Sequence, residues 1–219
     1  MQTSEPDEAE REIARHAVEH KWRLAVWDIA GGMRIPPAAA TDTCGDPLAA
    51  LRALPALAQA NGTAVLILHN FHRLLNSPEV VQATIGQLLA GKQQRCFLVV
   101  LSPVVSIPVE LEKLFVVLEH QLPDREQLLR IAQELTSELP EDLPKSAELE
   151  RVLDAAAGLT RYEAEGAFAL SIARHNRVRP EAIWELKAQT LRKNNLLALH
   201  RGKEQFDSLG GLNTTFLTA

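Results

Sequence analysis

Short apolar runs alternate with helix-length segments through the middle of the chain. Residues 63–69 (TAVLILH) and 95–102 (RCFLVVLS) are rich in Val, Ile and Leu, and a helical pattern at residues 77–91 separates them. Runs of this length and composition are typical of strands buried on both faces, and strands that alternate with helices pair in parallel. Ligands bind such sheets at the carboxyl ends of the strands. The candidate site therefore begins at His69, Asn70 and Ser102.

The same pattern extends to both sides of this block. It predicts a helix at residues 4–19, begun by Ser4 and burying Ala9, Ile13, Ala17 and Val18. It then predicts a strand at 22–28, a loop at 30–47, a helix at 48–60, a helical turn at 108–113 and a last strand at 115–119.

After Pro123 the pattern becomes helical only. It predicts helices at residues 124–139, 146–157 and 160–175, and a fourth one from Pro180, with capping boxes at 124–127 and 160–163. We predict an α/β parallel-sheet core followed by an all-helical lid. The expected divisions are a core at 1–123 with an incomplete first strand, the lid at 124–200, and a linker at 201–219.

Composition narrows the possible functions. The 219 residues are 46% hydrophobic and carry a net charge of −5. A negative net charge argues against electrostatic binding to nucleic acid, because phosphates are neutralised by basic side chains. No apolar run reaches the roughly 18 residues of a membrane span, so no membrane partner is expected. Two cysteines, Cys44 and Cys96, form no disulfide framework or metal set. A cytoplasmic location is the expectation.

Several segments resemble a known family. VLILHNF is similar to a Walker B strand, VVLSPVVSIPVELEKLF to a sensor-1 strand and its turn, and LPDREQLLRIAQEL to a lid entry. GLTRYEAEGAFALSIA is similar to the lid helix near sensor 2, and FDSLGGLN to the start of a further module. In this order they resemble an AAA-type ATPase, most closely the N-terminal half of the chloroplast-encoded and cyanobacterial AAA-family ATPases. There a degenerate first module precedes a catalytic one.

This resemblance has consequences for ligands and partners. It implies a P-loop-NTPase-like core, ATP and Mg²⁺ as the family's cofactors, and a catalytic AAA module or like subunits as partners. It also implies a chloroplast stroma location if the chain is plastid-encoded. By resemblance, the nucleotide-facing residues are His69, Asn70, Ser102 and Arg161.

The chain departs from the catalytic pattern. It contains no G-x-x-x-x-G-K-[ST], whose backbone N–H groups and Lys hold the phosphates. The equivalent turn, residues 3–8, carries three acids that would repel a polyphosphate, and Pro6 lacks an N–H. His69 and Asn70, which are poor Mg²⁺ ligands, stand where carboxylates are needed. We therefore expect no hydrolysis, no catalytic residue and no metal site.

Each candidate residue also has a structural interpretation, which we favour. His69, Asn70 and His72 form either a residual nucleotide- or metal-binding edge or a polar strand end. Asp28 anchors a loop or faces the crevice. Ser102 carries either a hydroxyl that acts like the family's sensor 1 or a hydroxyl with a structural role. The side chains of Arg125 and Arg161 either reach a phosphate or are solvated on a helix surface.

Three functions remain open. The first is a non-catalytic N-terminal module that serves the assembly or regulation of a catalytic AAA module. The second is ATP binding and hydrolysis, by family. The third is an interaction scaffold that uses the helices at 124–200. The incomplete first strand is expected to leave a sheet edge exposed, through which the chain associates.

Overall fold

The computed structural model describes residues 1–36, 40–42, 45–57, 62–137 and 140–193. It divides into two compact units. Of the described residues, the first unit comprises those in Met1–Asp124 and Gly158–Glu163, and the second comprises those in Arg125–Ala157 and those from Ala164 to residue 193.

A five-stranded sheet forms the centre of the first unit, with the strand order β3-β2-β1-β4-β5. Its parallel part consists of β1 (Arg23–Asp28), β4 (Ala64–His69) and β5 (Cys96–Leu101). An antiparallel extension follows, made of β2 (Gly32–Arg34) and β3 (Ala40–Asp42). The predicted α/β parallel-sheet core is confirmed.

The β2–β3 extension corrects the predicted loop at residues 30–47. Each of these strands has only three residues, which is too short for an alternating pattern to be recognised among Gly and Pro. The chain turns back after β1 because Asp28 Oδ1 accepts hydrogen bonds from the backbone N–H groups of Ala30, at 2.9 Å, and Gly31, at 2.6 Å. The preferred interpretation of Asp28 as a loop anchor is confirmed.

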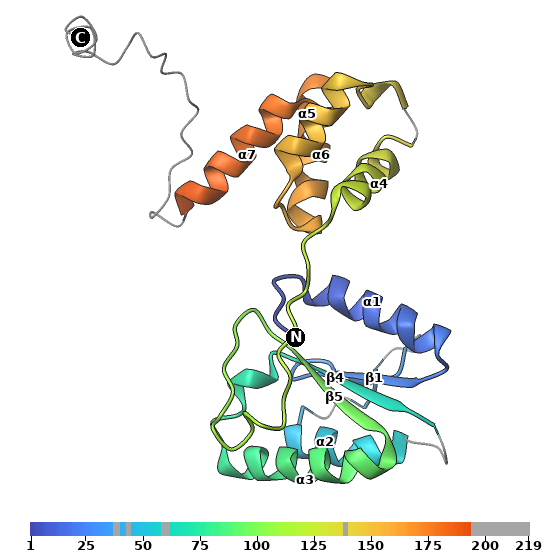
Figure 1. Ribbon diagram of the computed structural model, residues 1–219, viewed down its shortest axis with the longest axis vertical. Coiled ribbons are helices and arrows are strands. Elements are labelled where there is room, and N and C mark those ends of the chain that lie inside the picture. Colours follow the sequence, from blue (N-terminus) through green and yellow to red (C-terminus); the bar gives the residue numbers. More distant parts are fainter. Residues whose placement is uncertain (37–39, 43–44, 58–61, 138–139, 194–219) are drawn as a thin grey trace, which may run out of the picture. The chain divides into compact units, whose positions relative to one another are not determined.

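Helices cover both faces of the sheet (Figure 1). Helix α1 (Pro6–Glu19) packs on one face through Ala9 and Ala17. Helices α2 (Pro47–Leu57) and α3 (Pro78–Gln94) pack on the other. Alternate strand residues point to opposite faces, and the two resulting sets are Leu24, Val26, Val65 and Ile67 beneath α1, and Ala25, Trp27, Leu66 and Leu68 beneath α2 and α3.

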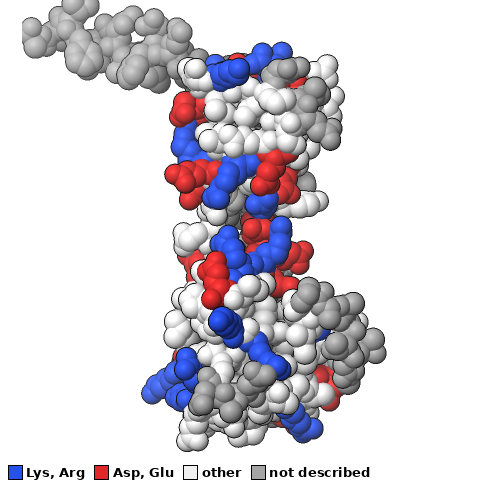
Figure 2. Space-filling view, turned by 90° about the vertical axis from the view of Figure 1, so that its right-hand side faces the viewer, with Lys and Arg blue, Asp and Glu red and all other residues white. Residues whose placement is uncertain are grey.

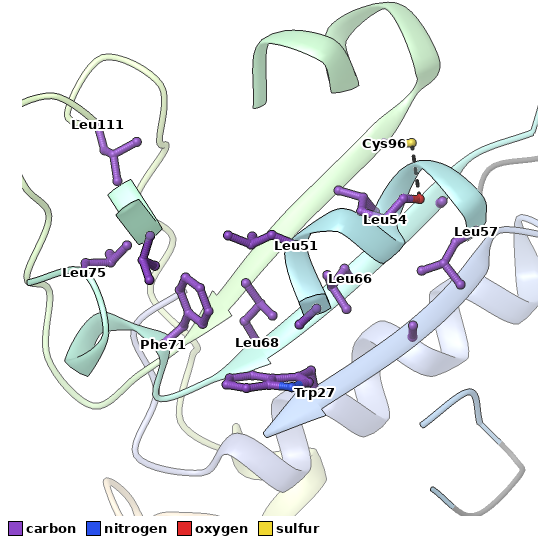
Figure 3. Packing of buried hydrophobic residues seen from close by; sticks show 14 residues of the cluster. Trp27, Leu51, Leu54, Leu57, Leu66, Leu68, Phe71, Leu75, Cys96 and Leu111 are labelled. Carbon is purple, nitrogen blue, oxygen red and sulfur yellow. Dashed lines mark hydrogen bonds between the residues drawn. The ribbon is translucent and has the colours of Figure 1, made fainter. Parts of the chain in front are cut away.

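The larger core lies on the α2 and α3 side (Figure 3). Trp27 and Phe71 meet edge to face, with their ring centroids 5.7 Å apart, an arrangement that the ring quadrupoles favour. Both side chains are fully buried, as are those of Leu51 and Leu54 on α2. Trp27 is therefore part of the core.

Helix α1 has the predicted end but differs in two details. The predicted buried stripe includes Val18, which is in fact 79% exposed. It follows Ala17, and one residue turns a helix by about 100°, so the two cannot both face the sheet. The N-cap position is occupied by Glu5 rather than Ser4, and no side chain caps the helix there.

Helix α3 begins at the predicted Ser77, whose hydroxyl accepts from the Val80 N–H at 3.5 Å. It does not end at Gly91 but continues to Gln94, and Arg95 adopts a left-handed conformation with φ 54°. Gly91 has a different role, because a Cβ there would lie 2.6 Å from the Cys96 carbonyl oxygen. The glycine allows β5 to pass close to the helix.

The predicted last strand at residues 115–119 is absent from the described structure. Only Glu119 forms a bridge, which pairs it with Gln2. The backbone pairing of this segment with residues 1–3 consists of the hydrogen bonds of Gln2 with Leu118 and His120. The helical turn predicted at 108–113 is a run of turns held by the Leu111 N–H, which donates to the Pro108 carbonyl at 2.9 Å.

The second unit is helical. It contains α4 (Arg125–Leu135), the short 3₁₀ turn η2 (Pro140–Asp142), α5 (Ala147–Ala156), α6 (Arg161–His175), whose first turn belongs to the first unit, and α7 (Pro180–Lys193). Its core is built from Leu128, Ile131, Val152, Leu153, Phe168 and Ile183. The predicted helix at 124–139 is shorter than expected, ending at Leu135.

The capping box at the start of α6 is confirmed. The Thr160 N–H donates to Glu163 Oε2 at 3.0 Å, and the Glu163 N–H donates to Thr160 Oγ1 at 3.2 Å.

Some of the predictions fall on other parts of the chain. The expected linker at 201–219, with the rest of the segment from residue 194, lies outside the described residues, as do the predicted helix end at 58–60 and Cys44. No helix in the described part combines the length and the apolarity that crossing a bilayer demands.

The burial pattern predicts the effect of truncating core side chains. We expect Leu66→Ala, at a fully buried position, to lower the free energy of unfolding by about 2–5 kcal/mol. Val18→Ser, at an exposed position, should change it by less than about 0.5 kcal/mol. Urea unfolding of both variants measures the difference, and an equally large loss for Val18→Ser would contradict the placement of α1.

Candidate functional site

The carboxyl ends of β4 and β5 lie side by side, which brings three of the sequence-predicted residues to one edge. His69 pairs with Leu101 in the parallel register, the Asn70 N–H donates to the Leu101 carbonyl at 2.9 Å, and Ser102 follows directly. Their side chains nevertheless have different surroundings and form no common site.

The His69 side chain contacts helix α1. Its Nε2 lies 2.8 Å from Glu10 Oε2, and the same oxygen accepts from Arg34 Nη2 at 2.5 Å. The side chains of His69 and Glu10 are 14% and 13% exposed, so the pair is largely shielded from water. Glu10 therefore connects α1 to β4 and β2, and His69 serves this connection rather than an open metal site.

Asn70 is exposed and adopts a left-handed conformation with φ 53°, which Asn tolerates better than most residues. It precedes the short 3₁₀ turn η1 (Phe71–Arg73), and its side chain makes no capping hydrogen bond there. The residue type is explained by the turn that the backbone makes between β4 and η1.

Ser102 is buried, and its hydroxyl donates to the Val104 carbonyl at 2.8 Å. Its backbone N–H donates to the Met1 carbonyl at 3.2 Å. Both polar groups are used within the protein, in the turn after β5 and in the contact with residues 1–3. This arrangement agrees with the structural interpretation of Ser102.

His72 has surroundings that the sequence did not reveal. It is 8% exposed, and neither ring nitrogen has a hydrogen-bond partner among the described residues. Its ring lines a pocket of about 40 Å³ whose walls also include Val100, Ser102, Ile107 and Phe115. Burial and the neighbouring Arg73 charge lower the pKa of His72, so its neutral form is favoured.

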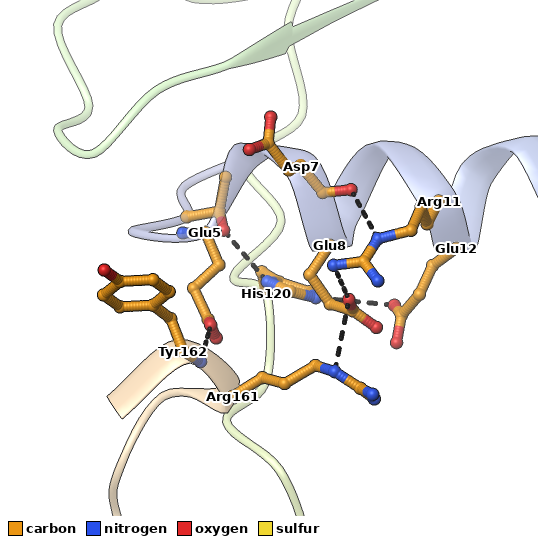
Figure 4. Close-up of polar contacts among 9 residues, drawn as sticks. Glu5, Asp7, Glu8, Arg11, Glu12, His120, Arg161 and Tyr162 are labelled. Carbon is orange, nitrogen blue, oxygen red and sulfur yellow. Dashed lines mark hydrogen bonds and ion pairs between the residues drawn. The ribbon is translucent and has the colours of Figure 1, made fainter. Parts of the chain in front are cut away.

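Polar contacts hold the turn before α1, which the resemblance compares with a phosphate-binding loop (Figure 4). The Thr3 hydroxyl accepts from the Glu5 N–H at 3.0 Å and lies 2.9 Å from His120 Nδ1. His120 Nε2 in turn lies 3.5 Å from a Glu12 carboxylate oxygen. Residues 117 positions apart thus hold the turn in place, a link that no local sequence signal could show.

The acids of this turn interact with nearby cations. Glu8 Oε2 lies 2.6 Å from Arg11 Nη2 and 3.8 Å from Arg161 Nε. Glu5 Oε1 accepts from the Tyr162 N–H at 2.9 Å. The segment that carries Arg161 and Tyr162 belongs to the same compact unit as α1. Arg161, which the resemblance predicts to face a nucleotide, lies beside the carboxylate of Glu8.

This edge does not fit a Mg²⁺-nucleotide. The first ten residues contain Glu5, Asp7, Glu8 and Glu10 but no Lys or Arg, and carboxylates repel a polyphosphate at short range. Positions 69 and 70 offer an imidazole and an amide where Mg²⁺ prefers carboxylate oxygens. On the face drawn in Figure 2, acidic and basic side chains are interspersed rather than separated by sign.

Arg125 lies in the second unit. It pairs with Glu150 and, at 2.6 Å, with Asp154 Oδ1 on α5. Its guanidinium therefore joins α4 to α5, which agrees with a structural role rather than a contact with phosphate.

An exposed cluster on α1 is the remaining candidate for a metal site. Among the described residues, His16, Glu19 and His20 are the only group close enough to share a metal ion. All three are exposed, and His20 Nδ1 already lies 2.9 Å from the His16 carbonyl.

Two domain models of one protein family match the chain. Residues 1–120 match the N-terminal domain of SpoVK-like AAA ATPases, and residues 125–194 match the second domain of the same proteins. No curated protein matches the chain.

Three solved structures resemble parts of the chain. The crystal structure of the FIGL-1 AAA domain in complex with ADP is 18% identical, with a TM-score of 0.45, and the match covers 62% of this chain and 54% of that one. A variant of Thermotoga maritima RuvB is 17% identical, with a TM-score of 0.43, and the match covers 67% of this chain and 49% of that one. C. elegans PCH-2 is 11% identical, with a TM-score of 0.44, and the match covers 68% of this chain and 46% of that one. The chain thus spans about half the length of each structure.

The contacts of Glu10 lead to a stability prediction. Glu10→Ala removes the acceptor that His69 and Arg34 share, so we expect the free energy of unfolding to fall by about 1–3 kcal/mol. Glu112→Ala, at an exposed position in a turn, is the control, with an expected change within about 0.5 kcal/mol. Equal losses in urea unfolding would show that the Glu10 contacts do not stabilise the fold.

The environment of His72 predicts a pH dependence. Because the pKa of His72 is lowered in the folded state, the unfolded chain takes up the proton first as the pH falls. The contribution of neutral His72 to the free energy of unfolding is fully present above the ordinary histidine pKa of about 6.5. It is lost as the pH drops below that value.

His72→Phe should therefore reduce the fall in melting temperature between about pH 7.5 and pH 5.5, a window that brackets the ordinary histidine pKa. Thermal unfolding followed by circular dichroism measures it. His16→Gln, at an exposed histidine, should leave the fall as it is in the original chain. An unchanged pH dependence in His72→Phe would mean that His72 does not contribute.

Proposed function

Since the chain belongs to the SpoVK-like AAA ATPases, with the family's N-terminal domain matching residues 1–120, we propose that it is a non-catalytic N-terminal module. It serves the assembly or regulation of a catalytic AAA module, and its own crevice does not turn over ATP.

The observation that carries this proposal is the use of the crevice residues within the fold. His69 binds Glu10, Ser102 binds Val104, and Arg161 lies beside Glu8. A nucleotide would have to break these contacts and also enter the negative field of the α1 turn. A group already paired in a shielded position gives up that pairing only at a free-energy cost.

The partners that suit this role are a catalytic AAA module or like subunits. We further propose that the chain belongs with the chloroplast-encoded and cyanobacterial members of the family and works in the cytoplasm or stroma. The buried free thiol of Cys96 suits a reducing compartment. Burial also raises the pKa of this thiol, which keeps it unreactive.

ATP binding and hydrolysis is the second candidate, because the family consists of ATPases. A titration of the full chain with a fluorescent ATP analogue and Mg²⁺ distinguishes the two functions. We expect no saturable binding and no phosphate release from ATP. Saturable binding that is lost in the double variant His69→Ala, Asn70→Ala would overturn the proposal in favour of residual nucleotide use.

The assembly role has a separate test. Sedimentation velocity over a concentration series should show association of the full chain that Mg²⁺-ATP leaves unchanged. The assembly role would be contradicted if the chain stayed monomeric at all concentrations and also failed to associate with a purified catalytic AAA module. Association that appears only with Mg²⁺-ATP would contradict the non-catalytic role.

A further inference from the structure

The carboxyl end of α1 brings two histidines and a carboxylate together on one side of the helix. His16, Glu19 and His20 stand at positions i, i+3 and i+4, which are neighbours on a helix surface. One ring nitrogen from each histidine and one oxygen of Glu19 lie within 4.8 Å of one another. All three residues are exposed, so an ion in solution can reach them directly. We call these three residues the α1 cluster.

The His20 ring is held in a form that can bind a metal ion. Its Nδ1 lies 2.9 Å from the His16 carbonyl oxygen. Because a carbonyl only accepts, Nδ1 carries the hydrogen in this contact, and the lone pair of the neutral ring is then on Nε2. Metal-binding histidines commonly donate their other ring N–H to a backbone carbonyl, which fixes the tautomer and the orientation of the ring. His20 thus presents Nε2 as its ligand atom.

The contact between His16 and Glu19 is loose enough for an ion to replace it. His16 Nδ1 lies 3.5 Å from Glu19 Oε2, which is longer than the roughly 2.7–3.2 Å of an N–H···O hydrogen bond. The two side chains are 58% and 55% exposed. An ion that binds both of them therefore displaces water and a weak contact rather than a buried pairing.

The ligand set selects the class of ion. Two imidazoles and one carboxylate suit Zn²⁺, Ni²⁺ and Cu²⁺, whereas Mg²⁺ and Ca²⁺ prefer oxygen ligands. Histidines four residues apart on one helix face are spaced to share a zinc ion. Ligand atoms about 2.0–2.2 Å from a tetrahedral ion lie about 3.3–3.5 Å from one another, a spacing that rotation of exposed side chains can reach. The carboxyl end of a helix also favours a positive charge.

We propose that the α1 cluster binds one divalent ion of the zinc class, with His16, Glu19 and His20 as its protein ligands. Among the described residues, no fourth His, Cys, Asp or Glu joins this group. Water therefore completes the coordination, as at other zinc sites with three protein ligands. By binding the folded chain, the ion would stabilise the end of α1.

Titration of the full, untagged chain with ZnCl₂ in a calorimeter tests this proposal. We expect saturable uptake of one Zn²⁺ per chain and no heat of binding with MgCl₂. A second measurement locates the ion, because the ring centroids of His20 and Trp22 are 5.0 Å apart. Paramagnetic Ni²⁺ in the cluster should quench the fluorescence of Trp22, and Trp22→Phe should remove this quenching while Zn²⁺ uptake persists.

Matched variants assign the ligands. His16→Gln and His20→Gln should each lower the affinity for Zn²⁺ by about tenfold or more, since losing even a group that orients a ligand costs about ten- to hundredfold. His175→Gln, at an exposed histidine of α6 outside the cluster, should leave the affinity unchanged. Zn²⁺ should also raise the melting temperature of the original chain but not that of the double variant His16→Gln, His20→Gln.

Three outcomes would overturn the proposal. They are the absence of saturable Zn²⁺ uptake, uptake that survives in the double variant, and an equal loss of affinity in His175→Gln. The α1 cluster lies at the opposite end of α1 from the turn at residues 3–8. The zinc titration and the ATP titration therefore test different sites, and either proposal can fail without the other.

Discussion

The burial of β4 on both faces and along both edges is the constraint on which the rest of the first unit depends. Residues 64–68 are almost inaccessible to solvent, and β1 and β5 pair with the two edges of the strand. A strand in this position cannot shift its register without exposing apolar side chains or losing hydrogen bonds on two sides. The positions of His69, Asn70 and the neighbouring Ser102 follow from this register.

The polar groups at this end of the sheet are then used to hold the helix and the turns. Glu10 brings together the side chains of His69 and Arg34, and Thr3 and His120 hold the chain before α1. Charge-assisted hydrogen bonds between partly buried groups are stronger than neutral ones. Through these contacts, polar groups at this end of the sheet stabilise the α1 layer.

One part of this end is less complete. The His72 ring is buried without a hydrogen-bond partner in the described structure, and it lines a pocket together with Val100 and Ser102 at the end of β5. Unpaired buried polar groups are costly, so the packing around His72 is the least favourable part of this end of the sheet.

The sequence alone determined the fold class, the three parallel strands, the capping box at Thr160 and the AAA-type resemblance. These depend on apolar periodicity and on contacts a few residues apart. Only the tertiary structure decided that Val18 is exposed, that residues 32–42 contain a hairpin and that residues 115–119 form no strand. It also decided the partners of the polar side chains. Glu10 meets His69 across 59 positions and Thr3 meets His120 across 117. Local patterns carry no information about such pairs, because the fold of the intervening chain brings them together.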